Sequence, residues 1–282
     1  MDNSKPVKTP CCSSSRLVSH SGFLLSDPTV YRSMDGALQY LTFTRPDLAF
    51  SVHQLCQFMS KPTSVHLEAA KRVLRYLRGT LNHGICFSPG PLSLTAFSDA
   101  DWAGDPTDRR STTGLLVFLG PNPISWSAKK QPTVSRSSTE AEYRALATTA
   151  AELSWLRILF KELRIFLPHV PVIWCDNILA IALSANPVFH SRTKHLEVDY
   201  HYVREKVLRR DLKVGFVSGT DNMADIFTKP LPAPPFLSFR SKLLVDFSPC
   251  RLRGDVEGEA QEQKNGGSGS TQVQQHEPCL KL

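Results

Sequence analysis

Apolar residues recur every three or four positions across residues 46–80, which is the period of an α-helix packed on one side. We predict one helix over 48–59 and a second over 64–78. Ser64 is a suitable N-cap for the second helix, and Gly79 is a suitable stop. The first part of the chain is therefore expected to be helical.

From residue 92 the apolar period shortens to two, which indicates β-strands. Short links join the first three strands, which favours an antiparallel meander. Strands and helices then alternate. The predicted strands are 92–98, 114–119, 124–127, 170–175 and 212–217, and the predicted helices are 137–163, 178–184, 196–208 and 220–227. This order predicts an α/β fold with a mixed five-stranded sheet and flanking helices.

Four regions follow from these patterns. Residues 1–27 are rich in Ser, Pro and Lys without a period, and we expect a flexible leader. Residues 28–90 are expected to form a small helical module, packed separately from a sheet domain over 91–245. Residues 246–282 lack a core pattern and are predicted to be a disordered tail.

Composition narrows the class of protein. Hydrophobic residues make up 41% of the 282 residues, which is ordinary for a globular protein. No apolar run is long enough for a membrane span, and the N-terminus has no apolar segment typical of a signal peptide. The seven cysteines are scattered without a C-x-x-C pair, so we expect reduced thiols and a cytoplasmic or nuclear location.

The net charge is +7, and residues 246–282 contain more acids than bases. The basic excess therefore lies in the predicted folded part, as a polyanion binder needs. The predicted helix over 64–78 has one face with Lys71, Arg72, Arg75 and Arg78. This face is either solvated charge or a surface for phosphates, and the sequence leaves both open.

Acidic residues stand out where a strand ends or where a helix faces its core. Asp99 and Asp176 end two predicted strands, at the edge where open α/β sheets bind ligands. In the long helix Ser137 and Glu140 form a capping box. Glu142 lies about 200° around the helix from Glu140 and continues the core-facing stripe. Glu142 is therefore the candidate metal carboxylate of that helix.

The last predicted helix, capped by Thr220, contains two aspartates on one face. Asp221 suits the positive end of the helix dipole, whereas Asp225 lies one turn deeper, where the dipole explains less. Asp99, Glu142, Asp176 and Asp225 are thus four candidates in four elements, and we predict that they converge. A close carboxylate cluster is costly unless a hard divalent cation neutralises it.

Several segments resemble the RNase H domain of copia-type LTR retrotransposon Pol polyproteins. They are SDADWAGD (98–105), RRSTTGLLVFLG (109–120), TEAEYRAL (139–146), WCDN (174–177) and NMADIFTKPL (222–231). Residues 31–80 resemble the end of the reverse transcriptase that precedes this domain. The resemblance implies a C-terminal Pol fragment, with a connection-like helical part over 28–90 and an RNase H-like domain over 91–245.

The resemblance also implies a function. Asp99, Glu142, Asp176 and Asp225 would hold two Mg²⁺ ions, or Mn²⁺ in their place, and would be the catalytic residues. Asp101 shares a strand face with Asp99, and only the resemblance decides between them. The implied reaction is two-metal hydrolysis of the RNA strand of an RNA–DNA hybrid. The 2′-hydroxyl would distinguish RNA from DNA.

Some expected parts are missing from the sequence. Residues 218–222 contain no histidine, although cellular RNases H often carry one before the last aspartate. The chain has no Y-x-D-D motif, so the polymerase palm is absent. We expect a separate reverse transcriptase in trans as a partner. The alternative function is a catalytically idle relic or a nucleic-acid-binding fragment.

Basic side chains near the predicted site are candidate contacts to nucleic acid. They are Lys129, Lys130 and Arg136 around the third strand, and Arg192 and Lys194 before the helix over 196–208. For Arg192 and Lys194 an ordinary basic helix entry is the equal alternative. No membrane partner is expected.

Overall fold

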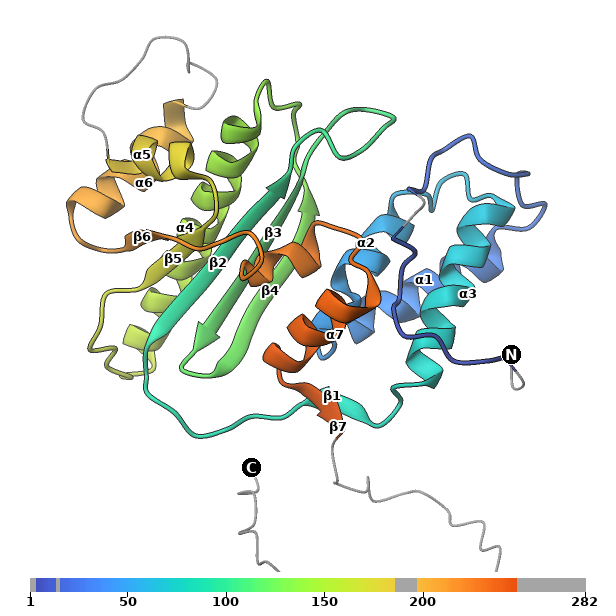
Figure 1. Ribbon diagram of the computed structural model, residues 1–282, viewed down its shortest axis with the longest axis horizontal. Coiled ribbons are helices and arrows are strands. Elements are labelled where there is room, and N and C mark those ends of the chain that lie inside the picture. The colour runs from blue at the N-terminus through green and yellow to red at the C-terminus, as the bar shows by residue number, and fades with distance from the viewer. Residues whose placement is uncertain (1–3, 14–15, 186–196, 248–282) are drawn as a thin grey trace, which may run out of the picture. The chain divides into compact units, whose positions relative to one another are not determined.

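The computed structural model describes residues 4–13, 16–185 and 197–247, which Figure 1 shows. Five strands form one sheet in the order β4-β3-β2-β5-β6. Strands β2, β3 and β4 are antiparallel neighbours, whereas β5 pairs in parallel with β2 and with β6. The strands are β2 (Leu94–Asp101), β3 (Thr112–Leu119), β4 (Asn122–Lys130), β5 (Val172–Cys175) and β6 (Lys213–Phe216). The predicted mixed five-stranded sheet with flanking helices is confirmed.

One face of the sheet is covered by helices from the second half of the chain. These helices are α4 (Ser138–Glu162), α5 (Ile178–Ala185) and α6 (Glu197–Leu208). Leu146 and Leu153 of α4 belong to one apolar cluster with Leu115 and Val117 of β3. This apolar stripe fixes the rotation of α4 on the sheet and therefore the direction of its other side chains.

The start of α4 follows the predicted capping pattern with one difference. The Ser137 side chain accepts a hydrogen bond from the Glu140 N–H, as expected of the N-cap. The Glu140 carboxylate accepts from the N–H of Arg136, at 2.8 Å, instead of from the N–H of Ser137 as in a capping box. It also forms an ion pair with Arg144. Glu140 is therefore committed to the helix start.

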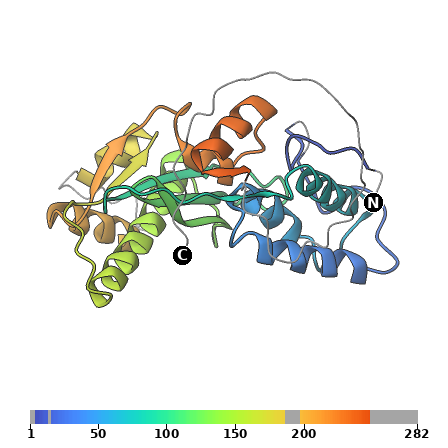
Figure 2. The same ribbon diagram turned by 90° about the horizontal axis from the view of Figure 1, so that it is seen from below.

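The opposite face of the sheet is covered by the N-terminal helices and by the end of the chain. The elements there are α1 (Thr29–Leu41), η1 (Pro46–Leu48), α2 (Ala49–Cys56), α3 (Ser64–Arg78), η3 (Met223–Phe227) and α7 (Ala233–Lys242). Side chains alternate along a strand, so Leu116 and Phe118 of β3 join this second apolar cluster. Figure 2 shows α4 and α7 on opposite sides of the sheet.

The helices do not pack separately from the sheet, contrary to the sequence-based expectation. Leu48 and Leu55 share one apolar cluster with Leu116 and Phe118. The indole N–H of Trp126 in β4 donates to the Thr42 carbonyl at 2.8 Å. The physical reason is that β3 is buried on both faces, so its second face needs a cover of helices. The boundary near residue 90 stays a prediction.

The N-terminal segment differs from the predicted flexible leader. Arg72, Arg75 and Arg78 of α3 donate hydrogen bonds of 2.8 to 3.0 Å to residues 4–9. Residues 4–9 therefore lie along the basic side of α3. These three arginines are engaged within the chain and are not simply solvated.

Some elements have no counterpart in the sequence pattern. They are α1, α7 and two short strands, β1 (His83–Ile85) and β7 (Val245–Phe247), which pair in antiparallel fashion. Residues 248–282 of the predicted tail lie outside the described residues. Among the described helices, none has the length and apolar character needed to cross a membrane.

Candidate metal centre

Four acidic side chains from four elements come together where β2 and β5 end. Asp99 lies in β2, Glu142 in the second turn of α4, Asp176 directly after β5 and Asp225 in η3. Asp99, Asp176 and Asp225 each place one carboxylate oxygen within 4.8 Å of the other two. The structure thus brings three of the predicted residues into one cluster.

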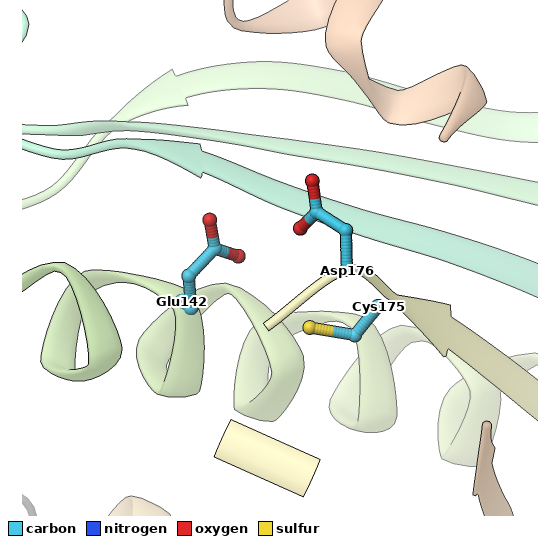
Figure 3. Close-up of side chains that lie close together, drawn as sticks. All are labelled: Glu142, Cys175 and Asp176. Atoms are coloured by element: carbon cyan, nitrogen blue, oxygen red, sulfur yellow. The ribbon is translucent and has the colours of Figure 1, made fainter. Parts of the chain in front are cut away.

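Glu142 joins this cluster through Asp176. One ligand atom of each of Glu142, Cys175 and Asp176 lies within 4.8 Å of the other two. Figure 3 shows the carboxylates of Glu142 and Asp176 facing each other from α4 and from the end of β5. All four predicted carboxylates therefore belong to one site. Cys175 is an additional neighbour that the sequence did not indicate.

Strand register explains why two of the acids meet. Strands β2 and β5 run in parallel, with Phe97 opposite Trp174. Asp99 and Asp176 both follow this pair by two residues, so they emerge at the same end of the sheet. The Asn222 amide then donates to the Ser98 carbonyl at 3.1 Å and ties the segment before Asp225 to β2.

A glycine lets the last acid approach the sheet. Gly114 of β3 lies opposite Asp99 in the ladder. A Cβ atom at Gly114 would lie 2.7 Å from Thr228 Cγ2 and 2.8 Å from the Ala224 carbonyl oxygen. Only a residue without a side chain allows η3 to lie this close to β3, so Gly114 helps to place Asp225.

Burial and mutual repulsion set the charge state of the cluster. The exposed fractions are 1% for Asp99, 7% for Glu142 and 9% for Asp225. Burial, with the charges of Asp99 and Asp176, raises the pKa of Glu142 to about 9. Burial and the Asp99 charge raise the pKa of Asp225 to about 6, and the same two causes raise that of Asp176. These raised pKa values are the result of packing several carboxylates together away from water.

Two neighbours of the cluster were missed by the sequence reasoning. The Lys229 ammonium lies 2.7 Å from Asp225 Oδ1 and 3.4 Å from Asp99 Oδ1, and the Thr228 hydroxyl donates to Asp99 Oδ2. Burial opposes the charge of Lys229, but the Asp99 and Asp225 carboxylates outweigh it and raise its pKa. The spacing of four between Asp225 and Lys229 was the available signal, because such residues meet on a helix.

Two other acids of the same elements lie outside the cluster. Asp101 accepts a hydrogen bond from the Thr112 N–H, and burial raises its pKa to about 7. It is absent from both groups of potential metal ligands among the described residues. Glu140 is likewise outside, since it caps α4 and pairs with Arg144.

The helix predicted over 220–227 begins later than expected. Asn222 caps it by accepting a hydrogen bond from the Ala224 N–H, and the five residues Met223–Phe227 form a 3₁₀ helix. Thr220 is therefore not the cap, and Asp221 precedes the helix, where its carboxylate accepts from the Ser218 hydroxyl at 2.7 Å. Asp221 and Asp225 do not share a helix face.

The predicted nucleic-acid contacts have different surroundings. Lys130 forms ion pairs with Asp105 and with Asp108, the latter at 2.9 Å, so its charge is used within the chain. Lys129 and Arg136 are exposed. Arg192 and Lys194 lie outside the described residues.

No protein-family model matches the chain. A retrovirus-related Pol polyprotein from transposon RE1 of Arabidopsis thaliana is 54% identical over 246 residues, which is 87% of this chain and 17% of that protein. The Pol polyprotein from transposon TNT 1-94 of Nicotiana tabacum is 40% identical over 84% of this chain and 18% of its own length. The chain thus spans less than one fifth of these relatives.

A solved structure of LC11-RNase H1, isolated from compost, aligns with 49% of this chain and 93% of its own. Its sequence identity is 16% and its TM-score is 0.38. Because the identity and the TM-score are low, the fold is assigned from the strand order of the sheet and not from this alignment. That order, three antiparallel strands followed by two parallel ones, is RNase H-like. Together with the identity to the plant polyproteins, it shows that this chain is related over most of its length to one part of the copia-type retrotransposon Pol polyproteins and that it has an RNase H-like fold.

Proposed function

We propose that this chain is a retrotransposon RNase H that hydrolyses the RNA strand of RNA–DNA hybrids with two Mg²⁺ ions. The observation that carries the proposal is the convergence of Asp99, Glu142, Asp176 and Asp225. Four acids from four elements have no structural reason to be buried together. Their mutual repulsion costs folding free energy, and a divalent cation removes that cost.

The residues present fit such a cation. Carboxylate oxygens are the ligands that Mg²⁺ prefers, and Mn²⁺ accepts the same set. The Oε2 atom of Glu142 is buried and has no hydrogen-bond partner among the described residues. A buried oxygen without a hydrogen-bond partner, next to Asp176 of the acidic cluster, is suited to bind a metal ion. When bound, the ions would stabilise the charge that develops on the scissile phosphate.

The chain itself supplies position and electrostatics. Asp99 and Asp176 are fixed by the ladder of β2 and β5, and Asp225 is fixed by the Asn222 cap. No side chain here needs to act as a nucleophile. Because residues 218–222 contain no histidine, no imidazole is available there to move a proton, and slow turnover is expected.

The proposed substrate contacts are basic. Exposed Lys129 and Arg136 would contact phosphates, and Arg192 and Lys194 are proposed for the same task from the sequence alone. Lys130 is a weaker candidate, because binding phosphate would break its ion pairs with Asp105 and Asp108. A separate reverse transcriptase acting in trans is the proposed partner that makes the hybrid.

The test is a gel assay of the full chain on a labelled RNA–DNA hybrid, with duplex DNA and duplex RNA as controls. We expect Mg²⁺-dependent cleavage of the RNA strand of the hybrid only. Asp176→Asn should abolish it, because Asp176 joins both groups of ligands. Cleavage that persists in EDTA or in D176N would refute the proposal. Hybrid binding without cleavage would favour the idle nucleic-acid binder.

A further inference from the structure

The Lys229 ammonium occupies oxygens that a metal ion would need. It contacts Asp225 Oδ1 at 2.7 Å and Asp99 Oδ1 at 3.4 Å. A Mg²⁺ ion binds carboxylate oxygens at about 2.0–2.1 Å and tolerates little departure from octahedral geometry. An ammonium on these oxygens withdraws their negative charge and repels a divalent cation bound beside it, so the two compete for the same carboxylates.

Lys229 is the only cation that forms a salt bridge with any of the four acids within residues 4–13, 16–185 and 197–247. Its place is determined by the local backbone. The Lys229 N–H donates to the Asp225 carbonyl at 3.0 Å, so the Asp225 and Lys229 side chains lie on the same side of this helical turn. Thr228 meanwhile donates to the other oxygen of Asp99. The segment 225–229 thus provides both an acid and its counter-ion.

The Lys229 ammonium can leave the cluster and move into solvent. The Lys229 side chain is 40% exposed, whereas that of Asp99 is 1% exposed. A lysine has a flexible four-carbon stem and three rotatable donors, so its head can move into water without moving the backbone. The carboxylates remain where the strands hold them.

We propose that Lys229 is the resident counter-ion of the metal centre, which holds the metal-free carboxylates together and is displaced when divalent ions bind. This inference rests on the proposed function, because it takes the cluster to be the metal site. Its consequence is that Lys229 lowers the affinity for metal. The chain then stays assembled without metal, and half-saturation needs a higher metal concentration than it would without Lys229.

The test measures metal binding directly, without the nuclease reaction. Mn²⁺ and Mg²⁺ are titrated by calorimetry into the full chain and into Lys229→Met, which keeps the stem and removes the charge. We expect K229M to bind metal on the order of tenfold more tightly. Its metal-free melting temperature should fall, and saturating Mn²⁺ should remove most of the difference from the parent.

Two further variants serve as controls. Lys242→Met removes a lysine of similar exposure, 46%, whose partner Asp221 lies 3.9 Å away and outside the cluster. K242M should leave metal affinity unchanged. Lys229→Arg retains the charge and should keep the weak affinity of the parent.

Each outcome decides the inference. Unchanged or weaker metal affinity in K229M overturns it, even if the parent cleaves hybrids normally. Tighter binding in K229M supports it even if no variant cleaves a hybrid, in which case only the proposed function fails. If neither protein binds Mn²⁺ or Mg²⁺, both fail. If K229M is unfolded alone, refolding with Mn²⁺ supports the inference and failure to refold overturns it.

Discussion

Glu142 and Glu140 lie two positions apart in α4, and their side chains have opposite surroundings. Glu140 accepts a hydrogen bond from the Arg136 N–H and pairs with Arg144 at the helix start. Glu142 points toward Asp176 with one oxygen unpartnered, in the described part of the chain. Within two positions the helix therefore carries one carboxylate that caps its start and one that faces the acidic cluster.

Glu142→Gln keeps the shape of the side chain and removes its charge. We expect hybrid cleavage to fall by orders of magnitude. The free energy of unfolding should hold or rise, because the substitution removes an ionisable group whose raised pKa, about 9 in the cluster, opposes folding at neutral pH. Glu140→Gln keeps a capping residue type and should change stability by less than about 1 kcal/mol, with cleavage retained. Cleavage assays and urea titrations of both variants check this. Loss of cleavage in E140Q alone would reverse the assignment.

Asp35 of α1 is a buried acid with no hydrogen-bond partner for either oxygen in the described region. Burial raises its pKa, and the nearby Cys56 thiol only partly offsets this. A raised folded-state pKa means that the group leaves stability intact below its unfolded value, near 3.8, and that stability is lost as the pH rises through the folded value.

We therefore predict that Asp35→Asn stabilises the protein at neutral pH. The gain should be about 1–3 kcal/mol, because a neutral amide is less costly to bury than a carboxylate that ionises at neutral pH. Near pH 3 the two proteins should be equally stable, because the Asp35 carboxyl is then neutral in both states. Urea unfolding at several pH values measures the difference. A gain that is independent of pH would show that the charge of Asp35 is not its cause.

For single residues, the sequence pointed to the four acids but not to their neighbours Lys229 and Thr228. Strand ends and a helix stripe are local patterns, and they pointed to Asp99, Glu142, Asp176 and Asp225. Lys229 and Thr228 belong to the site because η3 folds back onto β2 and β3, which is a long-range contact. Periodicity carries no information about the contacts to Asp99, although the spacing of four links Lys229 to Asp225.

Among the elements, η3 depends most on its neighbours. Its apolar residues Ile226 and Phe227 pack into the cluster under β3, and Gly114 leaves the space for it. Because η3 is a single short 3₁₀ segment, it has little stability of its own. The position of Asp225 therefore depends on the packing of η3 against β3 as well as on η3 itself.

Gly114→Ala should displace η3. The added methyl group would lie 2.7 Å from Thr228 Cγ2, so either β3 or η3 must shift. We expect a loss of about 1–3 kcal/mol in stability and weaker Mn²⁺ binding, because Asp225 moves away from Asp99.

Gly84→Ala in β1 is the matched control, because nothing lies within 4 Å of the added carbon. It should leave Mn²⁺ affinity unchanged. Calorimetric titration compares the two variants, and equal Mn²⁺ affinity in G114A and G84A would contradict the role given to Gly114.

Elements with a clear period were predictable, and those held by distant partners were not. Most of the sheet strands follow from alternation, and β5 follows from a short, nearly continuous apolar run. Helix α4 follows from its apolar stripe and the Ser137 cap. Helix α1 was missed because Pro28 at its N-cap makes no side-chain hydrogen bond and Gly36 interrupts its pattern. Strands β1 and β7 have three residues each and exist only because they pair across 160 positions of sequence, as with Ile85 and Val245.

For the whole molecule, the helices and the sheet share one core. The sheet residues Leu116 and Phe118 contact the same cluster as Leu48 and Tyr76. Residues 91–247 expressed alone would expose that face to water. We expect this fragment to melt at a lower temperature than the full chain and to bind a hydrophobic dye, whereas the full chain should unfold in one calorimetric transition. A fragment as stable as the parent would show that the helices are dispensable.

The pairing of β1 with β7 has a consequence for how this sequence can be inherited. The first strand lies before the sheet and the second lies after it, so the two ends of the sheet-bearing segment are joined by backbone hydrogen bonds. A genomic breakpoint between residues 86 and 244 would therefore leave one strand without its partner and one apolar face without its cover. Recombination that preserves a foldable product must carry this whole stretch as one exchangeable block.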